Sequence, residues 1–199
     1  MTKIREEINL PLRVHPQPQP HLSPGGDCAA CCIAGLCGIR PEQVYSRLMD
    51  GRVEPPSYPE YRQILEQALQ LGLIRRYNTD VPFWTVPHYY MAFGPCGYIS
   101  HPEWFRYLWM AFEAGYYGLA SVSFNKEGSR GQVPPRTDHI VLLCGARQLE
   151  IPHPTLPGAR IEDQVLVSCS AKSSPKEEWV PAQDFLSQRG GYNVILVKP

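Results

Sequence analysis

Small or apolar residues occupy every position from 28 to 36, in the run CAACCIAGL. A helix that is apolar on all sides is a buried helix, so this run predicts a helix inside the protein. Gly38 is suited to end that helix, because glycine readily adopts the left-handed conformation found at helix C-termini. Pro41 then starts a second predicted helix, over residues 42–49, because proline is favoured at the first helical position.

The spacing of apolar residues predicts two further long helices and at least four strands. Apolar side chains recur at helical spacing over residues 58–71 and 104–114. Runs that are rich in branched apolar residues, some of them alternating with polar ones, predict strands. These strands are expected over residues 118–124, 138–149, 165–168 and 192–197, with a short helix over residues 181–186 before the last strand.

Helices in the first half and strands in the second predict the α+β class, with a mainly antiparallel sheet of four or more strands. A chain of 199 residues, 43% of them hydrophobic, is long enough for one domain with a substantial core. We expect a single domain over residues 1–199, with an N-terminal arm (1–26), a helical half (27–115) and a sheet half (116–199). The arm contains HPQPQP, whose recurring prolines exclude a helix, and we expect it to be extended and irregular.

The charge balance and the hydropathy pattern exclude several classes of partner. Lys plus Arg and Asp plus Glu number 19 each, so the formal net charge is zero and no basic field favours nucleic acid. No apolar stretch approaches the roughly 20 residues that cross a bilayer, and the charged N-terminus lacks the apolar centre of a secretion signal. We therefore expect a cytoplasmic protein without membrane insertion, in which most of the seven cysteines are free thiols.

Cys28 is the strongest candidate for chemistry. It follows Gly25, Gly26 and Asp27, a turn that places it at the start of the predicted buried helix. Unpaired backbone N–H groups and the helix dipole stabilise negative charge there, which predicts a lowered pKa and a nucleophilic thiolate. His139 begins a predicted strand far along the chain and is the candidate base, because Cys–His hydrolases need these groups adjacent in space and not in sequence.

Three blocks of sequence together resemble a known family. They are DCAACCIA at 27–34, DHIVLLCG at 138–145 and VLVSCSA at 165–171. These blocks resemble motifs of the papain-like cysteine peptidases, and most closely the bacteriocin-processing peptidases that cut double-glycine leaders. The likeness covers residues 17–46 and 115–197. It implies a papain-like fold, with the helix that carries the catalytic cysteine packed on the sheet, and an acyl-enzyme intermediate formed by a Cys–His pair.

The resemblance also implies an oxyanion donor and a residue that orients the histidine. The family's glutamine lies about six residues before the cysteine, a position without glutamine here, so the upstream Gln19 is the predicted oxyanion donor. The family's aspartate falls on Ser168 or Cys169. We expect Ser168 to accept a hydrogen bond from His139, with Asp163 as an alternative from the preceding loop; without either, the site is a Cys–His dyad.

The predicted function is therefore a cysteine hydrolase, a peptidase or isopeptidase, that acts on a peptide or protein without a cofactor or metal. An acyltransferase would use the same acyl-enzyme. A non-catalytic binding module on the same fold is the rival from another class, because the orienting carboxylate is missing. Cys28 and Cys31 also have the C-x-x-C spacing of redox and zinc sites, but no preceding strand or second ligand pair accompanies them. Cys31, Cys32 and Cys37 are expected in the core.

Overall fold

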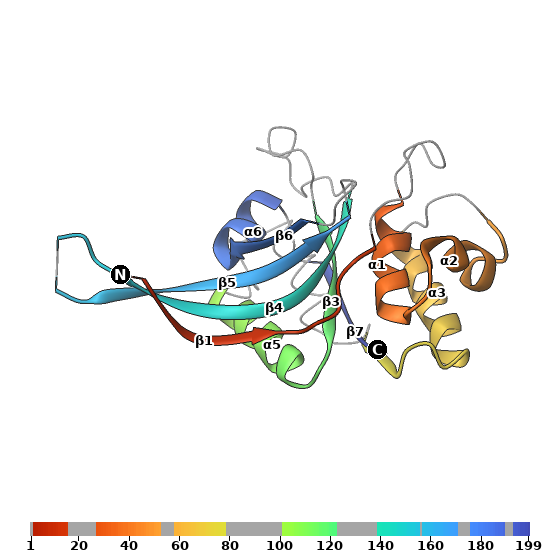
Figure 1. Ribbon diagram of the computed structural model, residues 1–199, viewed down its shortest axis with the longest axis horizontal. Coiled ribbons are helices and arrows are strands. Elements are labelled where there is room, and N and C mark those ends of the chain that lie inside the picture. Colours follow the sequence, from red (N-terminus) through yellow and green to blue (C-terminus); the bar gives the residue numbers. More distant parts are fainter. Residues whose placement is uncertain are drawn as a thin grey trace, which may run out of the picture.

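The computed structural model has the predicted α+β class, with a mainly antiparallel sheet and helices on both of its faces (Figure 1). It describes residues 2–15, 27–52, 58–78, 101–122, 139–155, 157–170, 176–189 and 193–199.

The helices of the described residues begin and end within three residues of the predicted boundaries. Helix α1 (Cys28–Cys37) is the apolar run, and all ten of its residues are buried. It ends at Gly38, whose φ of 62° is left-handed, as predicted. The remaining helices are α2 (Pro41–Leu48), α3 (Tyr58–Gln70), α5 (His101–Glu113) and α6 (Ala182–Arg189). No helix in this part of the chain is both long and apolar enough to cross a membrane.

Seven strands in the described ranges form one sheet, and every pair is antiparallel. They are β1 (Lys3–Asn9), β2 (Arg76–Asn78), β3 (Tyr117–Val122), β4 (His139–Pro152), β5 (Ala159–Cys169), β6 (Lys176–Pro181) and β7 (Asn193–Lys198). Their order is β2-β7-β3-β4-β5-β6, and β1 pairs with β4 beyond the segment that β3 covers. Strands β4 and β5 continue as a long hairpin past the helices (Figure 1).

The first half of β4 is buried on both faces. Ile140, Leu142 and Cys144 pack with residues of α1, α2 and α3, whereas Val141 and Leu143 pack with residues of α5 and α6. Side chains alternate between the two faces of a strand, so two buried faces give an unbroken apolar run. Figure 1 shows the same division, with α1 to α3 on one side of the sheet and α5 and α6 on the other.

Three strands were not predicted. The irregular arm expected over residues 1–26 is wrong for β1. Neither β2 nor β6 is among the predicted strands. Strand β1 (KIREEIN) is mostly exposed and charged, so it carries no apolar alternation for a pattern to detect. Its backbone pairs with β4, and such pairing becomes visible only in three dimensions. The arm and the helical half therefore contribute one strand each to the sheet.

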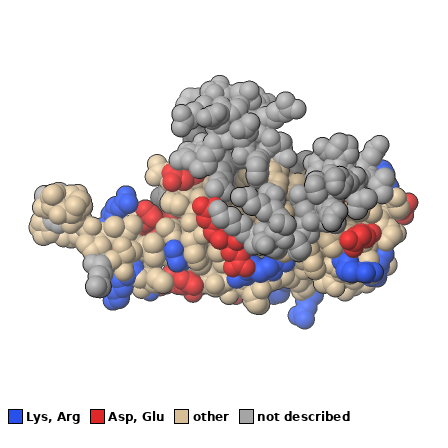
Figure 2. Space-filling model, turned by 45° about the horizontal axis from the view of Figure 1, so that its top comes forward, with Lys and Arg blue, Asp and Glu red and all other residues tan. Residues whose placement is uncertain are grey.

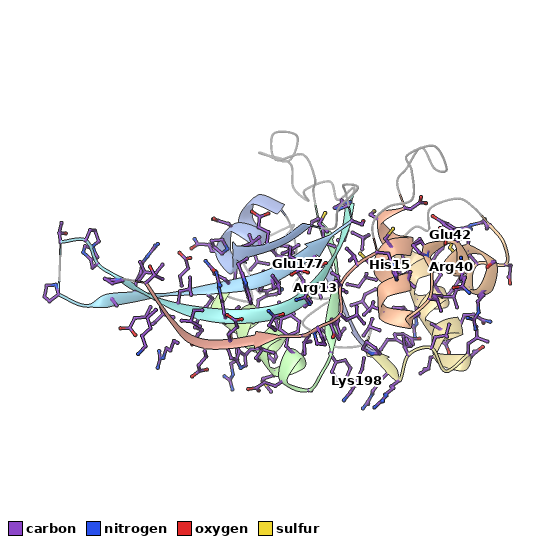
Figure 3. The ribbon with its side chains drawn as sticks, in the orientation of Figure 1. Arg13, His15, Arg40, Glu42, Glu177 and Lys198 are labelled. Carbon is purple, nitrogen blue, oxygen red and sulfur yellow. The ribbon has the colours of Figure 1, made fainter. Side chains whose placement is uncertain are left out.

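Residues 10–15 join β1 to the region of α1 and lie close against that helix. The Leu10 N–H donates to the Cys144 carbonyl at 2.8 Å, and the Leu12 N–H donates to the Tyr117 hydroxyl at 3.2 Å. The Arg13 guanidinium pairs with Glu177 of β6 (Figure 3). A Cβ on Gly35 of α1 would stand 2.7 Å from the Arg13 carbonyl oxygen, so only glycine permits this approach.

Replacing Gly35 with alanine tests this close packing. In an unhindered helix the change Gly→Ala stabilises a protein by about 0.5–1 kcal/mol. Here the added methyl group meets backbone, so we expect Gly35→Ala to lower the free energy of unfolding by about 1–3 kcal/mol. Urea denaturation measures it. Gln63→Ala, on the exposed side of α3, is the matched control and should change stability by less than about 0.5 kcal/mol. A more stable Gly35→Ala variant would contradict the packing.

Candidate active site

Cys28 is the first residue of α1, and its side chain is buried, with 7% of its surface exposed. Asp27 occupies the N-cap position, but its side chain makes no capping hydrogen bond. The Asp27 carboxylate instead accepts a hydrogen bond from the hydroxyl of Tyr45, which comes from α2. This bond fixes the residue immediately before the candidate nucleophile, and no pattern in the sequence points to Tyr45.

The predicted lowering of the Cys28 pKa is wrong in direction. Burial raises the pKa of the Cys28 thiol above its ordinary value of 9.0, although hydrogen bonds from the backbone of Ile140 and Ala29 lower it. Desolvation disfavours the charged form of a thiol, and here it outweighs the amides at the helix terminus. The resting group is therefore the neutral thiol, and its use as a nucleophile requires a base that removes the proton.

The backbone of β4 brings Cys28 close to the candidate base. The hydrogen bond from Ile140 to the Cys28 sulfur comes from the residue next to His139. The neighbouring thiol of α1, Cys32, donates to the Ile140 carbonyl at 3.7 Å. Pairing between β4 and β5 begins only at Leu142, so the edge of β4 at Ile140 is open to α1. The structure therefore places the start of α1 against the start of β4.

His139 is buried, with 8% of its surface exposed, and its Nε2 lies 3.1 Å from the Sγ of Cys169. The strand register explains this contact. Leu142 pairs with Ser168, so Cys169 stands opposite Val141, and His139 is the diagonal neighbour on the same face. Ile140 faces the opposite way, toward α1. The imidazole thus leaves β4 on the face that carries Cys169, while Cys28 meets the edge of the strand.

The other predicted site residues lie elsewhere. The Ser168 hydroxyl accepts a hydrogen bond from the Val14 N–H at 3.3 Å, so it holds the segment before α1. The Asp163 carboxylate accepts from the Gln148 amide at 2.9 Å, on the extended part of the β4–β5 hairpin. Of the three alternatives for the orienting position, Cys169 is the one whose side chain contacts the His139 ring. Gln19 lies outside the described residues.

None of the cysteines in the described residues forms a disulfide. Cys31, Cys32 and Cys37 are buried, as predicted, and Cys144 is buried as well; Cys169 is the more exposed exception. Within the part of the chain that the structure describes, no group of three or more His, Cys, Asp or Glu side chains could hold a metal ion. Positive and negative side chains are interspersed on the face seen in Figure 2, in keeping with the zero net charge.

No protein-family model, no curated protein and no solved structure matches this chain.

The hydrogen bond between Tyr45 and Asp27 should contribute measurably to the free energy of unfolding. A buried carboxyl group that loses a hydrogen-bond donor costs about 1–3 kcal/mol, so Tyr45→Phe should lower the free energy of unfolding by that amount. Tyr77→Phe is a matched control, because the Tyr77 hydroxyl donates to Glu66 at 2.7 Å on the exposed surface. Its effect should stay below about 1 kcal/mol. Equal effects of the two variants in urea denaturation would count against a buried anchor at Asp27.

Because thiols are buried in the fold, we expect the free energy of unfolding to fall as the pH becomes alkaline. Burial raises the pKa of Cys144 to about 12 from its ordinary value of 9.0. The unfolded state therefore releases this proton at lower pH than the folded state, and stability falls as pH rises above 9. Between pH 9 and 12 the thiol contributes a slope of about −1.4 kcal/mol per pH unit. The variant Cys144→Ala should lose that part of the slope in denaturation series, whereas Ser46→Ala should keep it.

Proposed function

We propose that this protein is a papain-like cysteine hydrolase, a peptidase or isopeptidase of the cytoplasm, in which Cys28 is the nucleophile and His139 the general base. One observation carries the proposal: the Cys28 thiol at the tip of α1 is hydrogen-bonded by the backbone of Ile140, directly beside His139. A thiol at a helix N-terminus and an imidazole from a distant strand are the two groups that such hydrolases combine.

The raised pKa of Cys28 assigns a definite role to the base. Because the thiol is neutral at rest, the reaction begins when His139 accepts its proton. The Nε2 of His139 contacts Cys169 in the resting geometry, so Nδ1, the other ring nitrogen, is the atom that would accept the proton of Cys28. The thiolate then attacks an acyl carbon of a peptide or protein substrate. His139 returns the proton to the leaving amine, and water or another acceptor releases the acyl group.

The amides at the start of α1 support the same step. Backbone groups of Cys28 and Ala29 hydrogen-bond the sulfur, and these N–H groups belong to the first turn of the helix, where they have no intrahelical acceptor. When negative charge moves from the sulfur to the carbonyl oxygen of the substrate, the same donors are available to it. Gln19 would add a side-chain donor to this oxyanion hole.

A second candidate function is a non-catalytic binding module. The deep burial of Cys28 and its raised pKa favour it, since an inert thiol is usually buried. The two functions differ in whether the reactivity of Cys28 depends on His139, and one labelling experiment separates them.

Alkylation with iodoacetamide at pH 7.5, followed by peptide mapping, measures that dependence. We expect Cys28 to react faster than the other buried cysteines, and His139→Gln to slow its reaction by roughly 10²-fold or more, the usual contribution of a general base. The measurement is repeated in Cys169→Ser, which removes the more exposed thiol from the competition. His153→Gln, in the exposed turn after β4, is the matched control and should leave the rate unchanged.

Two outcomes would reject the hydrolase. The first is a Cys28 that reacts no faster than Cys37 or Cys144. The second is a Cys28 whose rate is the same in the His139→Gln and His153→Gln variants. Circular dichroism of each variant confirms that it is folded before its rate is compared.

A further inference from the structure

Strand β1 has one paired edge and one open edge. It pairs with β4, and among the described residues no second strand pairs with it. An open edge presents backbone N–H and C=O groups that another strand can bind. The N-terminal end of β1 lies beside the long β4–β5 hairpin, beyond the helices (Figure 1). A second molecule can therefore approach this edge without meeting the helical part of the protein.

The charged side chains of β1 change sign along the strand. Lys3 and Arg5 occupy its first half, and Glu6 and Glu7 follow. All four residues are exposed, and none of them forms an ion pair within the part of the chain that the structure describes. The strand therefore carries a basic half and an acidic half whose charges have no partner of opposite sign among these residues.

The residue of β4 that stands opposite Glu7 is Arg147, and its side chain makes other contacts. The guanidinium lies 4.3 Å from the centre of the Trp179 ring, and its Nε donates to the Gln164 side chain at 2.8 Å. The carboxylate of Glu7 is thus left for a group outside the molecule.

We propose that β1 is a self-association surface, on which two copies of this chain pair antiparallel about a two-fold axis at Glu6. The same patch then faces itself, and every other contact occurs twice. The antiparallel direction places the basic half of one strand opposite the acidic half of the other. With Glu6 on the axis, Arg5 of each copy stands opposite Glu7 of the other copy, and Ile4 stands opposite Ile8.

These contacts favour a second copy over an unrelated strand. Opposite charges and apolar side chains that stand directly opposite each other stabilise antiparallel strands. Ile4, with 51% of its surface exposed, gains an apolar neighbour. The two Glu6 side chains repel each other on the axis, but two Arg5–Glu7 pairs flank them. Charged edge strands discourage unselective pairing, so the order of charges selects a partner with the reverse order.

The surface is small, so the association is reversible. It consists of one strand of seven residues, and the pairing of β1 with β4 is irregular between Ile4 and Glu6. Such a bulge bends and twists a strand, which limits the length over which a second copy can pair. Interfaces of small area belong to weak and transient complexes.

Sedimentation equilibrium of the whole protein, over a hundredfold range of concentration, tests the proposal. We expect the wild-type protein to pass from monomer to dimer as its concentration rises. Arg5→Glu and Glu7→Arg should each weaken the dimer by about tenfold or more, because each change turns two attractive pairs into like-charge pairs. Arg47→Glu, an exposed charge reversal on α2, is the matched control and should leave the dimer unchanged.

An equimolar mixture of the two variants makes the test specific. One copy then has acidic side chains at positions 5 and 7 and the other has basic ones, so both contacts are attractive again. The mixed dimer should be at least about tenfold tighter than the dimer of either variant. Circular dichroism confirms that each variant is folded.

Three outcomes would overturn the self-association surface. They are a wild-type protein that stays monomeric over the whole range, a dimer that both charge reversals leave intact, and a mixture that associates no more tightly than its components. The proposed function is untouched by any of them, because no residue of β1 belongs to the site at the start of α1.

Discussion

The arrangement of the whole molecule depends on the alternation of side chains along the first half of β4. Ile140, Leu142 and Cys144 are buried against α1, α2 and α3, while Val141 and Leu143 are buried against α5 and α6. This one strand joins the two halves of the core, and neighbouring strands pair along both of its edges. Burial of apolar surface on two faces is the main stabilising contribution that such a strand can make.

The same constraint creates the candidate active site. Since α1 must pack on the Ile140 face, the tip of the helix reaches the start of β4, where the partner strand β5 has already ended its pairing. The thiol of Cys28 is then buried beside the strand, and burial raises its pKa. The site that results has a neutral thiol, which couples any nucleophilic role of Cys28 to a nearby base. The site therefore does not need an ion pair between a Cys28 thiolate and a His139 imidazolium in its resting state.

Two adjacent residues of β5 make contacts on opposite sides of the site. Ser168 faces the segment before α1 and accepts the Val14 N–H, whereas Cys169 faces the ring of His139. A shift of one residue in the register would exchange these two contacts, because neighbouring side chains point to opposite faces. The long pairing of β4 with β5, from Leu142 to Pro152, holds the register and so decides which side chain meets the imidazole.

The sequence by itself determined the elements that carry their own pattern. Four features could be predicted from the chain alone: the apolar run of α1, the glycine that ends it, the proline that begins α2 and the apolar run of β4. The two apolar runs are recognisable because an element buried on every side has apolar residues at consecutive positions. The position of Cys28 at the start of a helix could be predicted because it is the first residue of that apolar run. Tertiary structure alone decided the rest. Strand β1 exists because β4 offers it an edge, the choice of Cys169 over Ser168 follows from pairing register, and the raised pKa of Cys28 follows from how deeply α1 is packed. Each of these depends on groups far apart in the chain, and their contact energies leave no trace in the spacing of nearby residues.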